Sequence, residues 1–77
     1  MNLETAQYLF EGIQADVVRL LVEKNGMSLN EALMTLHNSE TFAKLEDFET
    51  GLYIQSPGYI HAMLLSEIEH GRLTQQP

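Results

Sequence analysis

The chain of 77 residues contains no cysteine, no tryptophan and only two prolines. Without cysteine it has neither disulfides nor thiolate zinc sites, which stabilise many domains of this size. Well-packed helices, or association with a partner or a second copy, are the remaining means of stabilisation. A chain this short has room for one core, and we expect residues 1–77 to form a single domain.

Basic residues are also scarce. Only four Lys or Arg residues stand against eleven Asp or Glu residues, so the net charge is −7 and the pI is about 4.6. Nucleic acids and anionic membranes are bound through clustered Lys and Arg, so we expect neither as a partner. Two explanations of the acidity remain open. It favours a basic protein partner, or it only keeps the chain soluble.

Long apolar runs are absent as well. No stretch approaches the roughly 18 apolar residues of a membrane-spanning helix. The first residues, Met-Asn-Leu-Glu-Thr, lack the basic and apolar regions of a signal peptide. The sequence therefore predicts a cytoplasmic protein.

The clearest positive feature is an apolar stripe at helical spacing near the amino terminus. Apolar residues recur at steps of three and four from Leu3 to Leu20, which predicts a helix over residues 3–25. Asn2 is the expected N-cap, and Gly26 suits the left-handed position that ends a helix. Gly12 is unfavourable inside a helix, and we expect it to admit a closely packed neighbouring helix.

Capping residues predict three further helices, over residues 29–37, 40–46 and 57–70. Ser28, Ser39 and Ser56 are the expected N-caps, and Gly71 the expected end of the last helix. The β-favouring run Leu52-Tyr53-Ile54 predicts a short extended connector near residues 52–55. The fold class is therefore all-α, a compact domain of three or four helices. The expected core residues are Leu9, Phe10, Ile13, Val17, Leu20, Leu33, Leu36, Phe42, Leu45, Ile60 and Leu64.

Two apolar segments lie outside the predicted core and are candidates for an interface. One is a second strip on the first helix, and the other is the lone β-favouring run, which either lies against that helix or pairs with its copy in a dimer. The candidate interface residues are Ala15, Val18, Val22, Leu52, Tyr53 and Ile54.

Glu67 falls within the apolar arc of the last predicted helix. It lies either at the exposed margin of that arc or partly buried, where it must accept hydrogen bonds. In the second case the expected donors are the backbone amides of residues 52–55 or a tyrosine hydroxyl.

No arrangement of residues indicates catalysis, a cofactor or a metal. The histidines, His37, His61 and His70, are not at ligand spacing, and no cysteine assists them. The serines considered above are explained as helix caps, and neither a nucleophile elbow nor a phosphate-binding glycine loop is present. Residues 28–45 have the outline of a helix-turn-helix, but its second helix is too acidic for DNA. We expect no enzyme activity.

The segment Thr50-Gly-Leu-Tyr-Ile-Gln-Ser-Pro-Gly-Tyr-Ile, followed by Glu67, resembles small bacterial all-helical proteins of unknown function. The resemblance covers about residues 28–71. Some of those proteins are encoded beside toxin-like genes, including ADP-ribosyltransferase-like ones, which implies an antitoxin or accessory role. The expected function is therefore a protein-interaction module whose partner is a neighbouring-gene product. The alternative is a self-associating, homodimeric structural domain.

Overall fold

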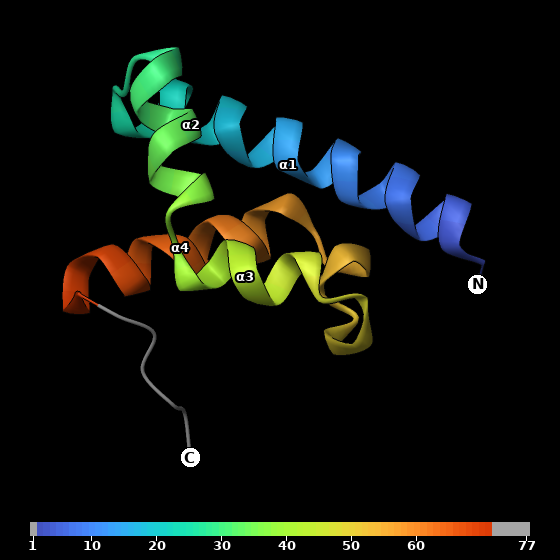
Figure 1. The fold of residues 1–77 in the computed structure, drawn as a ribbon. Helices are drawn as coiled ribbons and strands as arrows, with labels where there is room; N and C mark the ends of the chain where they lie inside the picture. Colours follow the sequence, from blue (N-terminus) through green and yellow to red (C-terminus); the bar gives the residue numbers. More distant parts are fainter. Residues whose placement is uncertain (1, 72–77) are drawn as a thin grey trace.

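Helix α1 (Leu3–Asn25) is the longest element of the computed structural model, which describes residues 2–71. Helix α2 (Leu29–His37) leads from the far end of α1 to α3 (Glu40–Glu46), and α4 (Pro57–His70) packs against both α1 and α3 (Figure 1). Two 3₁₀ turns, η1 (Phe48–Thr50) and η2 (Leu52–Ile54), join α3 to α4. Residues 2–71 contain no strand, and the predicted all-α class is confirmed.

The helix boundaries follow from local capping chemistry. The side chains of Asn2, Ser28, Ser39 and Ser56 each accept the amide three residues onward, at 2.8–3.1 Å. Each bond satisfies one of the amides that a helix start leaves unpaired. Gly26 and Gly71 adopt left-handed dihedrals, with φ of 68° and 78°. The four predicted helices and their caps are confirmed.

One apolar cluster holds the four helices together. It contains Phe10, Ile13, Val17, Val18, Leu21, Ala32, Leu36, Leu45, Ile60 and Leu64. The expected core is wrong at three positions on α1 and α2. Leu21 is fully buried, whereas Leu9 and Leu20 are only partly buried, and Leu33 is 36% exposed. The buried stripe therefore continues from Val17 to Leu21, at a step of four rather than three, because α4 and α2 meet that side of α1.

The expected extended connector is wrong for three of its residues. Leu52–Ile54 forms the η2 turn, in which the Ile54 amide donates to Gly51 and the Gln55 amide to Leu52. These local bonds satisfy backbone groups that have no strand partner. Gln55 alone keeps extended dihedrals. Pairing of this segment with its copy as a β-strand is therefore not supported, whereas its predicted position against α1 is confirmed.

Aromatic side chains fix the two turns to the helices. The ring of Phe48 lies 5.6 Å from that of Phe10 on α1 and 5.2 Å from that of Tyr53. The ring centroid of Phe42 on α3 lies 5.8 Å from that of Phe10. These contacts place η1 and η2 beside the amino-terminal half of α1. Among residues 2–71, no helix combines the length and apolar character needed to cross a membrane.

Candidate functional site

A groove between α1 and α2 contains one of the two predicted interface segments. We call it the α1–α2 groove, and its volume is about 570 Å³. Ala15, Val18 and Val22 line its α1 side, as the second apolar strip of that helix. Leu29 and Leu33 line its α2 side. The structure thus brings the three α1 candidates together with Leu29 and with Leu33, which the sequence predicts in the core.

The exposure of these leucines follows from the orientation of α2. Ala32 and Leu36 are fully buried and face the core, which turns the neighbouring stripe of the helix toward the groove. Leu29 is consequently 62% exposed. Val18, only 8% exposed, forms the floor, whereas Val22 is 36% exposed at the wall. Large apolar side chains that share one groove and remain open to solvent are typical of binding surfaces.

The polar groups around the α1–α2 groove carry balanced charge. Arg19 and Glu23 are the charged residues that line it. Arg19 also contacts Asp16 at 3.1 Å, in a pair that is open to solvent on both sides. The His37 ring lies at the α2 end, near the Gln14 amide oxygen at 3.4 Å. The groove is therefore close to neutral in a protein that is strongly acidic.

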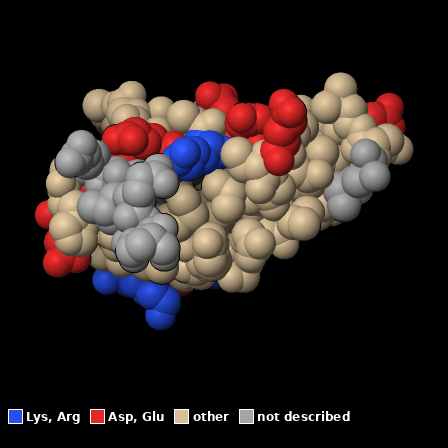
Figure 2. Space-filling model, turned by 90° about the horizontal axis from the view of Figure 1, so that it is seen from below, with Lys and Arg blue, Asp and Glu red and all other residues tan. Residues whose placement is uncertain are grey.

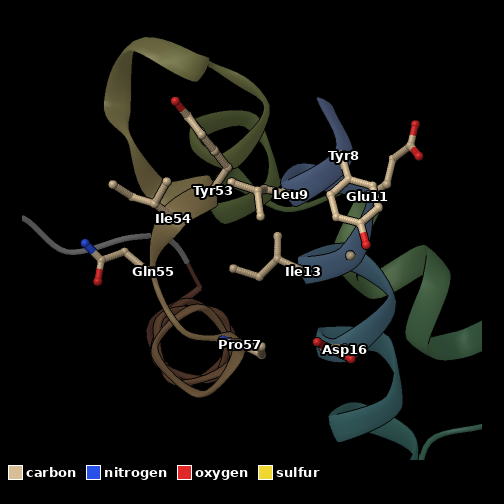
Figure 3. Close-up of a pocket in the computed structure, with 10 residues that line it drawn as sticks. Tyr8, Leu9, Glu11, Ile13, Asp16, Tyr53, Ile54, Gln55 and Pro57 are labelled. Atoms are coloured by element: carbon tan, nitrogen blue, oxygen red, sulfur yellow. The ribbon is translucent and has the colours of Figure 1, made fainter. Parts of the chain in front are cut away.

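A second groove lies on the other side of the core stripe of α1, between this helix and η2 (Figure 3). We call it the α1–η2 groove, and its volume is about 530 Å³. Tyr53 and Ile54 form part of its wall. Leu52 lines neither groove and packs, as Tyr53 also does, against the core cluster. The six candidate interface residues therefore do not form one surface, since they divide between two grooves and the core.

Gly12 lies in the α1–η2 groove, and its expected role is wrong. A Cβ atom built on Gly12 would meet no atom within 4 Å. No helix of the described chain therefore approaches this glycine. The fold thus gains no close packing in return for the cost of a glycine inside a helix, which is about 1 kcal/mol relative to alanine.

Glu67 is the most highly bonded side chain of α4. Its carboxylate accepts the backbone amides of Glu40 at 2.8 Å and Thr41 at 2.9 Å, and the Thr41 hydroxyl at 2.8 Å. The side chain is partly buried, and Thr41 is fully buried. The expected donors, residues 52–55 or a tyrosine, are wrong. Glu67 instead caps the start of α3, which is a structural role.

The histidines lie apart from one another and make local contacts. His61 on α4 lies 2.8 Å from the Asn25 side-chain oxygen, and His70 bonds the Ser66 carbonyl within its own helix. Burial, and secondly the positive charge of Lys24, lower the pKa of His61 below 6.5. Within residues 2–71, no three His, Asp or Glu side chains gather as metal ligands.

The buried polar groups of the described chain are satisfied. No buried side-chain nitrogen or oxygen between residues 2 and 71 lacks a hydrogen-bond partner. A polar ligand would have to be recognised by exposed polar side chains or by backbone groups. The two open grooves beside α1, both mainly apolar, are the surfaces that offer contact area instead.

Comparison with protein-family models, with curated proteins and with solved structures finds no match to this chain. The function proposed below consequently rests on the surface of the molecule and on the sequence resemblance.

Proposed function

We propose that this protein is an interaction module that binds another protein through the α1–α2 groove. The observation that carries the proposal is the exposure of Val22, Leu29 and Leu33 around one shared groove. Removing apolar surface from water contributes about 25 cal/mol per Å², so covering these side chains favours association.

The shape of the groove suits an amphipathic helix of the partner. Residues 15, 18 and 22 on α1 and residues 29 and 33 on α2 form two apolar rows, each following helical spacing. A third helix can place its apolar face between two such rows, as in other helix-in-groove complexes. Val18, at the floor, would then lie beneath the apolar anchors of the partner.

The biological role that we propose is that of an acidic, cytoplasmic accessory or antitoxin-like protein. The resemblance of residues 28–71 to small bacterial helical proteins, some encoded beside toxin-like genes, supports this role. The net charge of −7 supports a basic partner, because complementary charge speeds association and suppresses wrong partners.

The alternative function is that of a self-associating structural domain, and the rim of the groove favours it. Arg19 and Glu23 have opposite charge and lie one helical turn apart on α1. In a twofold dimer the same surface meets itself, so Arg19 of one copy can meet Glu23 of the other. Because the groove is close to neutral, two copies that meet there would not bring most of their acidic residues into contact.

The test uses two aspartate variants of exposed residues. Val22→Asp combined with Leu33→Asp should abolish binding through the groove, since both carboxylates would be buried in the complex. Met34→Asp is the matched control, because Met34 is 57% exposed on α2 but does not line the α1–α2 groove.

Sedimentation and co-purification distinguish the two functions. A concentration-dependent dimer that the groove variant abolishes would favour the homodimer. A monomer that co-purifies with a neighbouring-gene product, and loses it only in the groove variant, would favour the heterologous module. If the protein is monomeric and every complex survives the groove variant, the proposal is wrong.

A further inference from the structure

Beyond its chain neighbours and the backbone of its own helix, no described residue lies within 4 Å of where a Cβ atom of Gly12 would be. Tyr8, one turn before Gly12, is 75% exposed, and Asp16, one turn after it, also lines the α1–η2 groove. A glycine between two groove-lining neighbours leaves the helix backbone open to close approach. Because nothing in the described chain makes that approach, the open backbone suits an element from outside.

The opposite wall of the α1–η2 groove is mainly apolar, with Gln55 as its polar side chain. Ile54 is 60% exposed and lies there beside Tyr53 and Pro57, whereas Leu9 and Ile13 project from α1 between the walls (Figure 3). An occupant therefore needs an apolar face directed at the floor.

The charge of the α1–η2 groove favours an occupant with basic side chains. Glu11 and Asp16 line it, and no Lys or Arg does. The Arg19 that contacts Asp16 belongs to an exposed pair, which is worth little and exchanges readily. Glu11 bonds only the neutral amide of Gln7, at 3.2 Å, among the described residues.

The chain just before η2 is also acidic. Glu46 ends α3, Asp47 caps η1 and Glu49 lies in η1, whereas η2 packs on α1. Figure 2, which views the molecule from below, shows acidic side chains and no Lys or Arg at the end nearest the amino terminus. A second copy of the chain would bring further acids to these acids, so charge disfavours it here.

We propose that the α1–η2 groove binds a basic amphipathic helix of a protein partner. The apolar face of that helix packs on Leu9, Ile13 and Ile54, and its backbone passes closest to α1 at Gly12. Its Lys or Arg side chains meet Glu11 and Asp16, and cation–π contacts with the exposed Tyr8 ring add to the attraction. This site is separate from the α1–α2 groove, and either proposal can fail without the other.

The test measures binding of a synthetic peptide by fluorescence anisotropy. The peptide is about five helical turns long, with leucine on one face and lysine on the other. Gly12→Gln should weaken its binding about tenfold or more, since the longer side chain fills the point of closest approach. Gly12→Ala should weaken it by less than about threefold, since only a methyl group is added.

The same variants control for unfolding. Both should melt above the parent, because glutamine and alanine favour a helix more than glycine does and a Cβ at this position meets nothing. A loss of binding therefore cannot arise from a lost fold. If Gly12→Gln binds the peptide as the parent does, or if the parent does not bind it, the proposal is overturned.

A charge-matched pair of variants separates site binding from general attraction. Glu11→Gln with Asp16→Asn removes two charges from the groove, whereas Glu31→Gln with Glu69→Gln removes two charges elsewhere. The first pair should weaken binding several-fold more than the second at the same salt concentration. Equal effects of the two pairs would show that the peptide responds only to net charge, and would overturn the proposal.

Discussion

Replacing Glu67 by glutamine should destabilise the protein more than any other single change of one carboxylate to an amide. The carboxylate accepts two backbone amides and one hydroxyl at 2.8–2.9 Å. Glutamine has only one acceptor oxygen, and its NH₂ group would face an amide N–H. If the amide oxygen takes the Oε1 position, both Thr41 bonds survive and the exposed Glu40 amide loses its acceptor. In the other orientation both donors of Thr41 lose their acceptor, and Thr41 is too buried for water to replace it.

The expected loss is moderate because the three bonds are not equally buried. The bond from the Glu40 amide is exposed, and those from Thr41 are part-buried. A lost helix cap costs about 0.5–2 kcal/mol, and an unsatisfied buried donor about 1–3 kcal/mol. We expect Glu67→Gln to lower the free energy of unfolding by about 1–3 kcal/mol, and the melting temperature by roughly 5–20 °C.

Urea denaturation followed by circular dichroism measures this loss. Glu69→Gln is the control, because it removes the same charge from an exposed residue of α4 whose side chain bonds no other residue between positions 2 and 71. The control should change the free energy of unfolding by less than about 0.5 kcal/mol.

A double-mutant cycle with Thr41→Val isolates the contact itself. Valine keeps the shape of threonine and removes the hydroxyl that donates to Glu67. If the two residues interact as described, the combined effect of Glu67→Gln and Thr41→Val differs from the sum by about 0.5–3 kcal/mol. Strict additivity, or a Glu67→Gln variant as stable as the Glu69→Gln control, would refute the capping role.

Leu21→Ala should lower the free energy of unfolding, measured by denaturant titration, by about 2–5 kcal/mol, because it leaves a cavity in the core. Leu20→Ala should lower it by less, because Leu20 is only partly buried. A larger loss of stability for Leu20→Ala than for Leu21→Ala would contradict the burial of Leu21 and favour Leu20 as the core residue. Gly12→Ala should raise the free energy of unfolding by about 1 kcal/mol, since the new Cβ meets nothing, and a lower melting temperature would contradict the open space. Burial and Lys24 lower the pKa of His61, so the unfolded chain binds its proton more readily and stability should fall as the pH drops below about 6.5. Thermal melts at several pH values should show a shallow slope that His61→Gln removes, because the imidazole is only partly buried.

Features of the fold that depend on neighbouring residues could be predicted from the sequence. Ser28, Ser39 and Ser56 cap helices through bonds to amides three residues away, so their role is visible in any short window. Gly26 and Gly71 end helices for an equally local reason. The helix boundaries therefore follow from the chain itself.

Features that depend on the packing of distant elements could not be predicted. The spacing of α1 allows either Leu20 or Leu21 to face the core, and only the position of α2 and α4 selects Leu21. The same packing exposes Leu33 in the α1–α2 groove. The sequence indicates the apolar strip on α1 but not the α2 residues that form the other wall of the groove. It does not indicate the donors to Glu67, because they lie 26 and 27 residues away.

The link between Glu67 and α3 has a consequence for the order in which the protein folds. Helix α3 has seven residues, too few to persist as an isolated helix in water. Ser39 accepts the Phe42 amide locally. The amides of Glu40 and Thr41 have no such local acceptor, and they bond Glu67 only once α4 has packed beside α3. Helix α3 should therefore form only as α4 docks, and its first-turn amides should exchange with solvent in the same opening event that releases α4.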